Sequence, residues 1–77
     1  MNGTVRAFVN EVPVLVPAGA PAVAAVEAFD PVLAERVRAG EAYLTDGRGI
    51  RMEAGTTLSP GAILRVLTAR TARDADA

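Results

Sequence analysis

The chain has 77 residues and a net charge of −1, and 51% of its residues are hydrophobic although only 4% are aromatic. This length fits a single domain, whose core must be built from Val, Leu, Ile and Ala. There is no cysteine, histidine or lysine, which excludes disulfides, thiolate metal sites, the usual neutral-pH general base and Schiff-base chemistry. We therefore expect a protein that is not an enzyme and holds no cofactor or metal.

Charge and hydropathy also bear on partners and location. A net charge of −1 provides no overall electrostatic attraction to nucleic acid or to an anionic membrane, which argues against either as the partner. Met1 leads into a polar, strand-like stretch without the basic and apolar regions of a signal peptide. The longest apolar run is far shorter than the ~20 residues that cross a bilayer. We expect a cytoplasmic protein.

The first elements are a strand pair. Residues 4–9 and 12–16 alternate with a period of two, which predicts two strands joined by a turn at Asn10 and Glu11. Pro13 lacks an amide hydrogen, so its strand should lie at a sheet edge or turn that position outward.

A helical region follows the segment "PAGAP" at 17–21. Residues 22–29 are predicted to be helical, with Pro21 in the first helical position. Asp30 and Pro31 fit the start of a second helical segment, because Asp caps free amides and Pro suits the next position. This segment runs to about residue 39, and Gly40 is its predicted end.

Three further strands are predicted. Residues 41–45 and 50–53 form two short strands joined by "DGRG". "SPG" at 59–61 fits a type II turn with Gly61 at positive φ. The most apolar segment, "AILRVLT" at 62–68, suits the centre of a sheet.

This order predicts an α+β domain over residues 1–68, followed by a flexible tail at 69–77. The sheet should be mixed and four- to five-stranded, with one helix, continuous or broken at Asp30-Pro31, packed across one face. The sequence contains no visible internal repeat.

Three stretches of this chain resemble the β-grasp (ubiquitin-like) fold, and in particular the small sulfur carriers of the ThiS and MoaD type. They are "VNEVPVLVPAGAPAVAAVEAF" (9–29), "GEAYLTDGRGI" (40–50) and "TTLSPGAILRV" (56–66). The resemblance covers roughly residues 4–68 and rests on turns and core positions. It implies that the first and last strands pair in parallel at the centre of the sheet.

The carrier chemistry of that family depends on a C-terminal Gly-Gly, whose carboxylate is activated and converted to a thiocarboxylate. In this chain Gly61 is the last glycine, and the sequence ends Asp74-Ala75-Asp76-Ala77. A side chain near the terminal carbonyl would obstruct the narrow channel that the tail must enter. Carrier activity therefore requires a route without diglycine, and it stays an alternative.

The glycine- and arginine-rich stretch "TDGRGIRME" at 45–53 raises the question of a phosphate site. It matches neither a P-loop nor a dinucleotide-binding turn, and strand-like residues follow it. Asp46-Gly47 is a strong hairpin signal, so a structural turn is favoured. The alternative is a surface loop that contacts a partner through Arg48 and Arg51.

The last strand suggests a binding surface. Period-two alternation separates Ile63, Arg65 and Leu67 from Leu64 and Val66. If the second group packs under the helix, the first lies on the open side of the sheet, beside two residues of the first strand. The predicted partner-binding residues are Arg6, Phe8, Ile63, Arg65 and Leu67, an apolar group with arginines that is typical of interfaces. An ordinary small-domain surface stays the competing interpretation.

The remaining charged residues have simpler interpretations. Glu27, Asp30 and Glu35 are expected on a solvated helix face, since no pocket is predicted around them. Arg70, with Arg73 in the tail, could extend a basic strip, but the acidic pI and missing stacking aromatics argue against RNA.

We therefore predict a non-catalytic protein-binding module related to the sulfur carriers. Its partner would be a protein of unknown identity, with Arg48, Arg51 and Arg70 as secondary contacts, and not a nucleic acid or membrane. A homodimer formed through an edge strand or the same face stays open.

Overall fold

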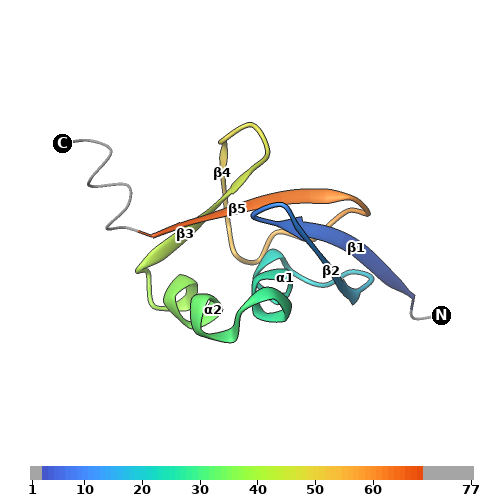
Figure 1. Ribbon diagram of the computed structural model, residues 1–77, viewed down its shortest axis with the longest axis horizontal. Coiled ribbons are helices and arrows are strands. Elements are labelled where there is room, and N and C mark those ends of the chain that lie inside the picture. The colour runs from blue at the N-terminus through green and yellow to red at the C-terminus, as the bar shows by residue number, and fades with distance from the viewer. Residues whose placement is uncertain (1–2, 69–77) are drawn as a thin grey trace.

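The computed structural model describes residues 3–68, which form five strands and two helices (Figure 1). In chain order these are β1 (Thr4–Val9), β2 (Val12–Pro17), α1 (Ala22–Phe29), α2 (Pro31–Arg38), β3 (Ala42–Asp46), β4 (Arg51–Met52) and β5 (Ala62–Thr68). The predicted tail at 69–77 lies outside the described residues. No helix in the described part of the chain is long and apolar enough to cross a membrane.

The strands form one mixed sheet in the order β2-β1-β5-β3-β4. β1 and β5, the first and last strands, run parallel at its centre, and every other neighbouring pair is antiparallel. Both helices lie against the same face of the sheet, and the opposite face is left uncovered (Figure 1). The predicted α+β class, central parallel pair and one-sided helical layer are confirmed, with the helical region divided in two.

The β1–β2 connection is a two-residue turn that is bonded to the last strand. Asn10 and Glu11 have φ values of 50° and 72°, as a type I′ hairpin turn requires. The Asn10 N–H donates to the Leu64 carbonyl at 3.0 Å, and the Val66 N–H donates to Asn10 Oδ1, also at 3.0 Å. The turn was predicted, but this attachment to β5 was not.

The helical region is broken at Asp30-Pro31, which is one of the two alternatives that the sequence left open. Asp30 has an extended backbone (φ −160°, ψ 106°), and its carboxylate accepts a bond from the Val32 N–H at 3.0 Å. Gly40, at φ +81°, follows the end of α2 as expected. Pro21 precedes the first helical residue instead of occupying it, since its ψ of 162° lies in the extended region.

One hydrophobic cluster fills the space between the helices and the sheet. Leu44 and Leu64 supply its largest side chains from the sheet, and both are almost fully buried. Ala25 of α1 and Ala34 of α2 have no exposed surface, so the helices approach the sheet closely at these small residues. Leu58, in the long connection before β5, is also buried, and sequence periodicity did not identify it.

The β3–β4 hairpin differs in detail from its prediction. β3 begins and ends one residue later than expected, and β4 contains only Arg51 and Met52. The positive φ of the connecting loop falls on Gly49 (+86°), not on Gly47. Gly47 instead lies against the side chain of Ile63. A Cβ added at position 47 would be only 3.1 Å from Ile63 Cγ2, so a larger residue would crowd Ile63.

The carboxylate of Asp46 organises this loop and predicts a dependence of stability on pH. Its Oδ1 accepts bonds from the Ile50 N–H (3.0 Å) and the Arg48 N–H (2.8 Å). The bond from Ile50, followed by the contacts with Arg48, holds the pKa of Asp46 below 3.8, although partial desolvation opposes the shift. Because the folded-state pKa is lowered, the stabilisation is present above about pH 4 and is lost as the pH falls through the lowered value.

The expected result is an Asp46 carboxyl resonance that titrates below the ordinary aspartate pKa in an NMR experiment. In the Asp46→Asn variant, the free energy of unfolding should fall less on acidification than it does in the parent protein, because the titrating carboxylate is gone. Urea unfolding between about pH 2 and pH 6, the range over which carboxylates titrate, measures this difference. A titration at or above the ordinary value would show that the loop bonds do not persist in solution.

Candidate protein-binding face

The sheet surface turned away from the helices is the candidate site. We call it the open face, and it consists of the strand side chains that alternate outward from the core, including Arg6, Leu15, Tyr43, Arg51 and Arg65. The inward set contains Ala7, Val9, Leu44, Leu64 and Val66, all buried. All five residues predicted to bind a partner therefore lie on the open face.

The centre of the open face is a pair of apolar residues from the two parallel strands. Phe8 of β1 is directly opposite Ile63 of β5, and Pro13 of β2 lies opposite Phe8 on the other side. Ile63 is 51% exposed and Phe8 is half-buried. Leu15, opposite Arg6, is 63% exposed and extends the apolar surface across β2.

Leu67 belongs to a different part of this face. It is four residues beyond Ile63 on β5, or about 13 Å along the strand. Its partner is Tyr43 of β3, and both are half-buried. Arg65, opposite Thr45, separates this second apolar pair from the Phe8–Ile63 pair. The predicted residues thus share one face but do not form one continuous apolar patch.

The charges of the open face are all positive within the described strands. Arg6 precedes Phe8 by two residues and Arg65 follows Ile63 by two, so the arginines flank that pair and stand about 13 Å apart along the strands. Both are exposed, and neither forms an ion pair with any described residue. A chain with a net charge of −1 therefore presents a positively charged surface here.

The acidic residues of the helices are engaged elsewhere. Glu27 and Glu35 both form ion pairs with Arg38 at 3.2 Å on the exposed side of the helical layer. Asp30 caps α2. These residues match the solvated helix face that the sequence predicted, and none of them lies on the open face.

The predicted secondary contacts are distributed differently. Arg48 lies in the β3–β4 loop and pairs with Asp46 at 3.4 Å. Arg51 lies on the open face, with its guanidinium 4.8 Å from the centre of the Tyr43 ring. Arg70 lies outside the described residues.

Sequence reasoning missed Leu15 and Tyr43 as members of this surface. The signal was present, because the alternation that places Val12, Val14 and Val16 on one side of β2 places Leu15 on the other. Tyr43 follows from the same rule once Leu44 is assigned to the core.

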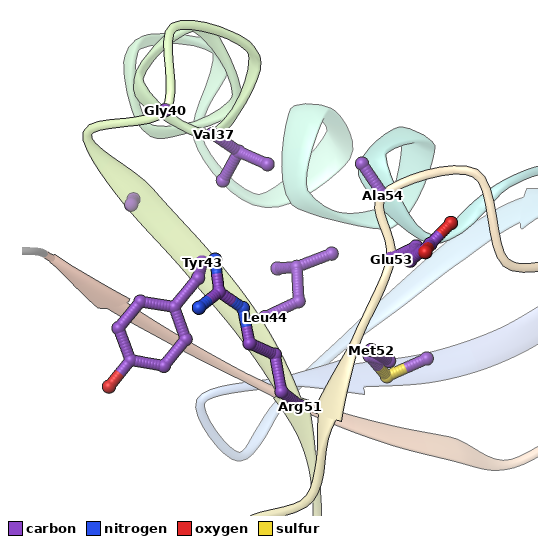
Figure 2. Close-up of a pocket in the computed structure, with 9 residues that line it drawn as sticks. Val37, Gly40, Tyr43, Leu44, Arg51, Met52, Glu53 and Ala54 are labelled. Carbon is purple, nitrogen blue, oxygen red and sulfur yellow. The ribbon is translucent and has the colours of Figure 1, made fainter.

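A pocket of about 480 Å³ opens at one edge of the sheet, between the end of α2, β3 and β4 (Figure 2). Val37, Leu44 and Met52 contribute apolar side chains to it, and Arg51 and Glu53 contribute charged ones. Figure 2 shows the Arg51 guanidinium beside the Tyr43 ring. Nothing in the sequence analysis predicted this pocket.

Comparison of the chain with models of protein families, with curated proteins and with solved structures finds no match. Among residues 3–68 there is also no group of three or more His, Cys, Asp or Glu side chains that could hold a metal ion. The functional argument therefore depends on the surfaces described above.

Proposed function

We propose that the chain is a β-grasp domain that works as a non-catalytic protein-binding module and contacts its partner through the open face. The observation that carries this proposal is the Phe8–Ile63 pair, which lies on the helix-free side of the sheet between two arginines without carboxylate partners among the described residues.

The topology supports the fold part of the proposal. The resemblance to the β-grasp fold implies a parallel central pair made by the first and last strands, with the helical layer on one side. The order β2-β1-β5-β3-β4 and the parallel register of Phe8 with Ile63 agree with that expectation. The relation to ThiS- and MoaD-type proteins rests on the sequence resemblance.

The surface supports the binding part. Interfaces combine an apolar centre, aromatic residues and arginine with a polar rim. Leu15 and Ile63 are more than half exposed on this face, and folding leaves that apolar surface in contact with water. Exposed arginines without internal carboxylates can pair with acidic groups of a partner, which sets orientation and increases the association rate.

The test is capture of partners by the immobilised protein from an extract of its source cells, with identification by mass spectrometry. Arg65→Glu and Ile63→Asp should each reduce recovery of a specific partner by about tenfold or more, because they place a negative charge at the centre of the face. Phe8→Ala should do the same by removing the aromatic contact.

Arg36→Glu is the matched control for Arg65→Glu, because Arg36 is also exposed but lies on α2, away from the open face. It should leave capture unchanged, and amide NMR spectra should show that all variants keep the fold. If the open-face variants recover the same partners as the parent protein, the surface assignment is wrong.

The sulfur or acyl carrier alternative depends on residues 69–77, outside the described part of the chain. Incubation with ATP and candidate activating enzymes, followed by intact mass measurement, separates it from the binding module. An AMP adduct or replacement of a terminal oxygen by sulfur would favour the carrier over the module.

A further inference from the structure

The two edges of the sheet differ in their capacity to accept another strand. At the β2 edge, Val9 and Val12 flank the two-residue turn and form a hydrogen-bonded pair, so the N–H and C=O of Val12 face β1. By alternation, the backbone groups of Pro13, Leu15 and Pro17 face away from the sheet. Pro13 and Pro17 have no N–H, which leaves only Leu15 as an outward donor. This edge is protected against strand addition.

The opposite edge is open over part of its length. The Asp46 N–H donates to the Ile50 carbonyl at 2.9 Å, so the backbone groups of Asp46 face β4, and by alternation those of Leu44 and Ala42 face the same way. β4 pairs only with Leu44 and Thr45. The chain then turns away, and the Ala54 carbonyl accepts a bond from the Val23 N–H of α1 at 3.0 Å.

Ala42 is consequently left at an open edge. Continuing the β3–β4 register would place Ala54 opposite Ala42, but Ala54 is bonded to the helix instead. Ala42 forms no backbone hydrogen bond outside the sheet ladders in the described part of the chain. Its outward N–H and C=O are the pair of groups that an added strand residue would bond.

The 480 Å³ pocket lies directly beside this open edge, and Ala42 is among the residues that line it. Residues opposite each other in an antiparallel pair point their side chains to the same side of the sheet. The side chain of Ala42 points into the core, so a residue bonded to Ala42 would point its own side chain toward the helices. That direction leads into the pocket, between Val37 and Leu44 (Figure 2).

Neighbouring residues of such a strand would point to the other side, where Tyr43 and Arg51 are located. The Arg51 guanidinium is held 4.8 Å from the Tyr43 ring centre and has no carboxylate partner among the described residues. A guanidinium placed over a ring keeps its N–H donors available for a carboxylate.

We propose that the gap between β3 and the chain beyond β4 binds an extended peptide segment of a partner protein. One peptide residue bonds to the Ala42 backbone and places an aliphatic side chain in the pocket, and an acidic neighbour pairs with Arg51. This site is separate from the Phe8–Ile63 pair, and it does not depend on the function proposed for the open face.

The probe is a capped synthetic peptide, acetyl-Asp-Leu-Asp-Ser-amide, titrated into the ¹⁵N-labelled protein. No residue precedes its first aspartate, because the position opposite Leu44 is already occupied by Met52. We expect saturable shifts with a Kd below about 1 mM, a downfield shift of the Ala42 amide, and further shifts at Tyr43 and Arg51. Methylation of the leucine nitrogen should abolish binding because it removes the donor to the Ala42 carbonyl. Methylation of the following aspartate nitrogen, which points away from β3, should leave the affinity unchanged.

Protein variants complete the test. Arg51→Ser should weaken peptide binding at least about tenfold, because a charge-assisted bond is lost. Arg36→Ser is the control and should have no effect. Phe8→Ala should also leave the affinity within about twofold, because Phe8 is on β1, which β5 and β3 separate from β4, and the change introduces no charge. This separates a failure here from a failure of the open-face proposal.

Three results would overturn the inference. They are the absence of saturable shifts up to millimolar peptide, shifts confined to residues around Phe8 and Ile63, and free leucine binding as tightly as the peptide. The last result would assign the pocket to a small molecule instead of a strand.

Discussion

Leu64→Ala should lower the free energy of unfolding by about 3 to 4 kcal/mol. Leu64 is 1% exposed and lies on β5, the strand between β1 and β3, where its side chain joins the core beneath the helices. Truncation removes buried methyl groups and leaves a cavity that rigid neighbouring strands cannot close. A domain of this size has a total stability on the order of 5 kcal/mol, so the variant should be close to its unfolding midpoint without denaturant.

The matched control is the adjacent residue. Ile63 is 51% exposed and points to the open face, so Ile63→Ala should cost less than about 1 kcal/mol, mainly through its contact with Gly47. Urea unfolding followed by circular dichroism measures both. Equal losses at the two positions would mean that β5 does not present Leu64 to the core and Ile63 to solvent, and the open face would then be assigned to the wrong residues.

Asn10→Ala should lower the free energy of unfolding by about 2 kcal/mol. The change removes the acceptor of the Val66 N–H, a backbone donor beside the sheet centre, and leaves that donor without its partner. It also places alanine at φ 50°, a left-handed backbone conformation that costs less for Asn than for most other residues.

Two further variants separate these contributions. Asn10→Gly relieves the backbone cost but still lacks the acceptor, so it should recover only part of the loss. Asn10→Asp keeps an acceptor for Val66 and should stay closest to the parent protein. Amide hydrogen exchange at Val66 should accelerate in the Ala and Gly variants, and unchanged protection there would contradict the role of the Asn10 side chain.

The charges of this chain are distributed unevenly between the helical layer and the open face. The helical layer carries Glu27, Asp30 and Glu35 against Arg36 and Arg38, three negative charges against two positive ones, whereas the outward side chains of the strands carry only arginines. The two layers therefore differ in sign although the sum is −1. Binding through the open face should weaken as salt rises, since exposed charges are screened within about 10 Å at 0.1 M.

Local patterns predicted most of the elements. Alternation in residues 4–9 and 62–68 separated core from surface side chains, because a strand has a fixed period of two. Asp30, Gly40 and Gly61 marked a helix start, a helix end and a turn through their own backbone and capping preferences. The placement of Arg6, Phe8, Ile63 and Arg65 on one face then required only the topology that the β-grasp resemblance implied.

The amino-acid sequence by itself determined the approximate positions of the strands, the residues at which the helical region could break, and most of the apolar core, because each depends on periodicity or on the preferences of a single residue. Only the tertiary structure decided which side chains meet. It separated Leu67 from Ile63, bonded Asn10 to β5, and opened a pocket beside Ala42 where β4 ends after two residues. Those features arise from contacts between segments far apart in the chain, and no local pattern specifies the distance between such segments.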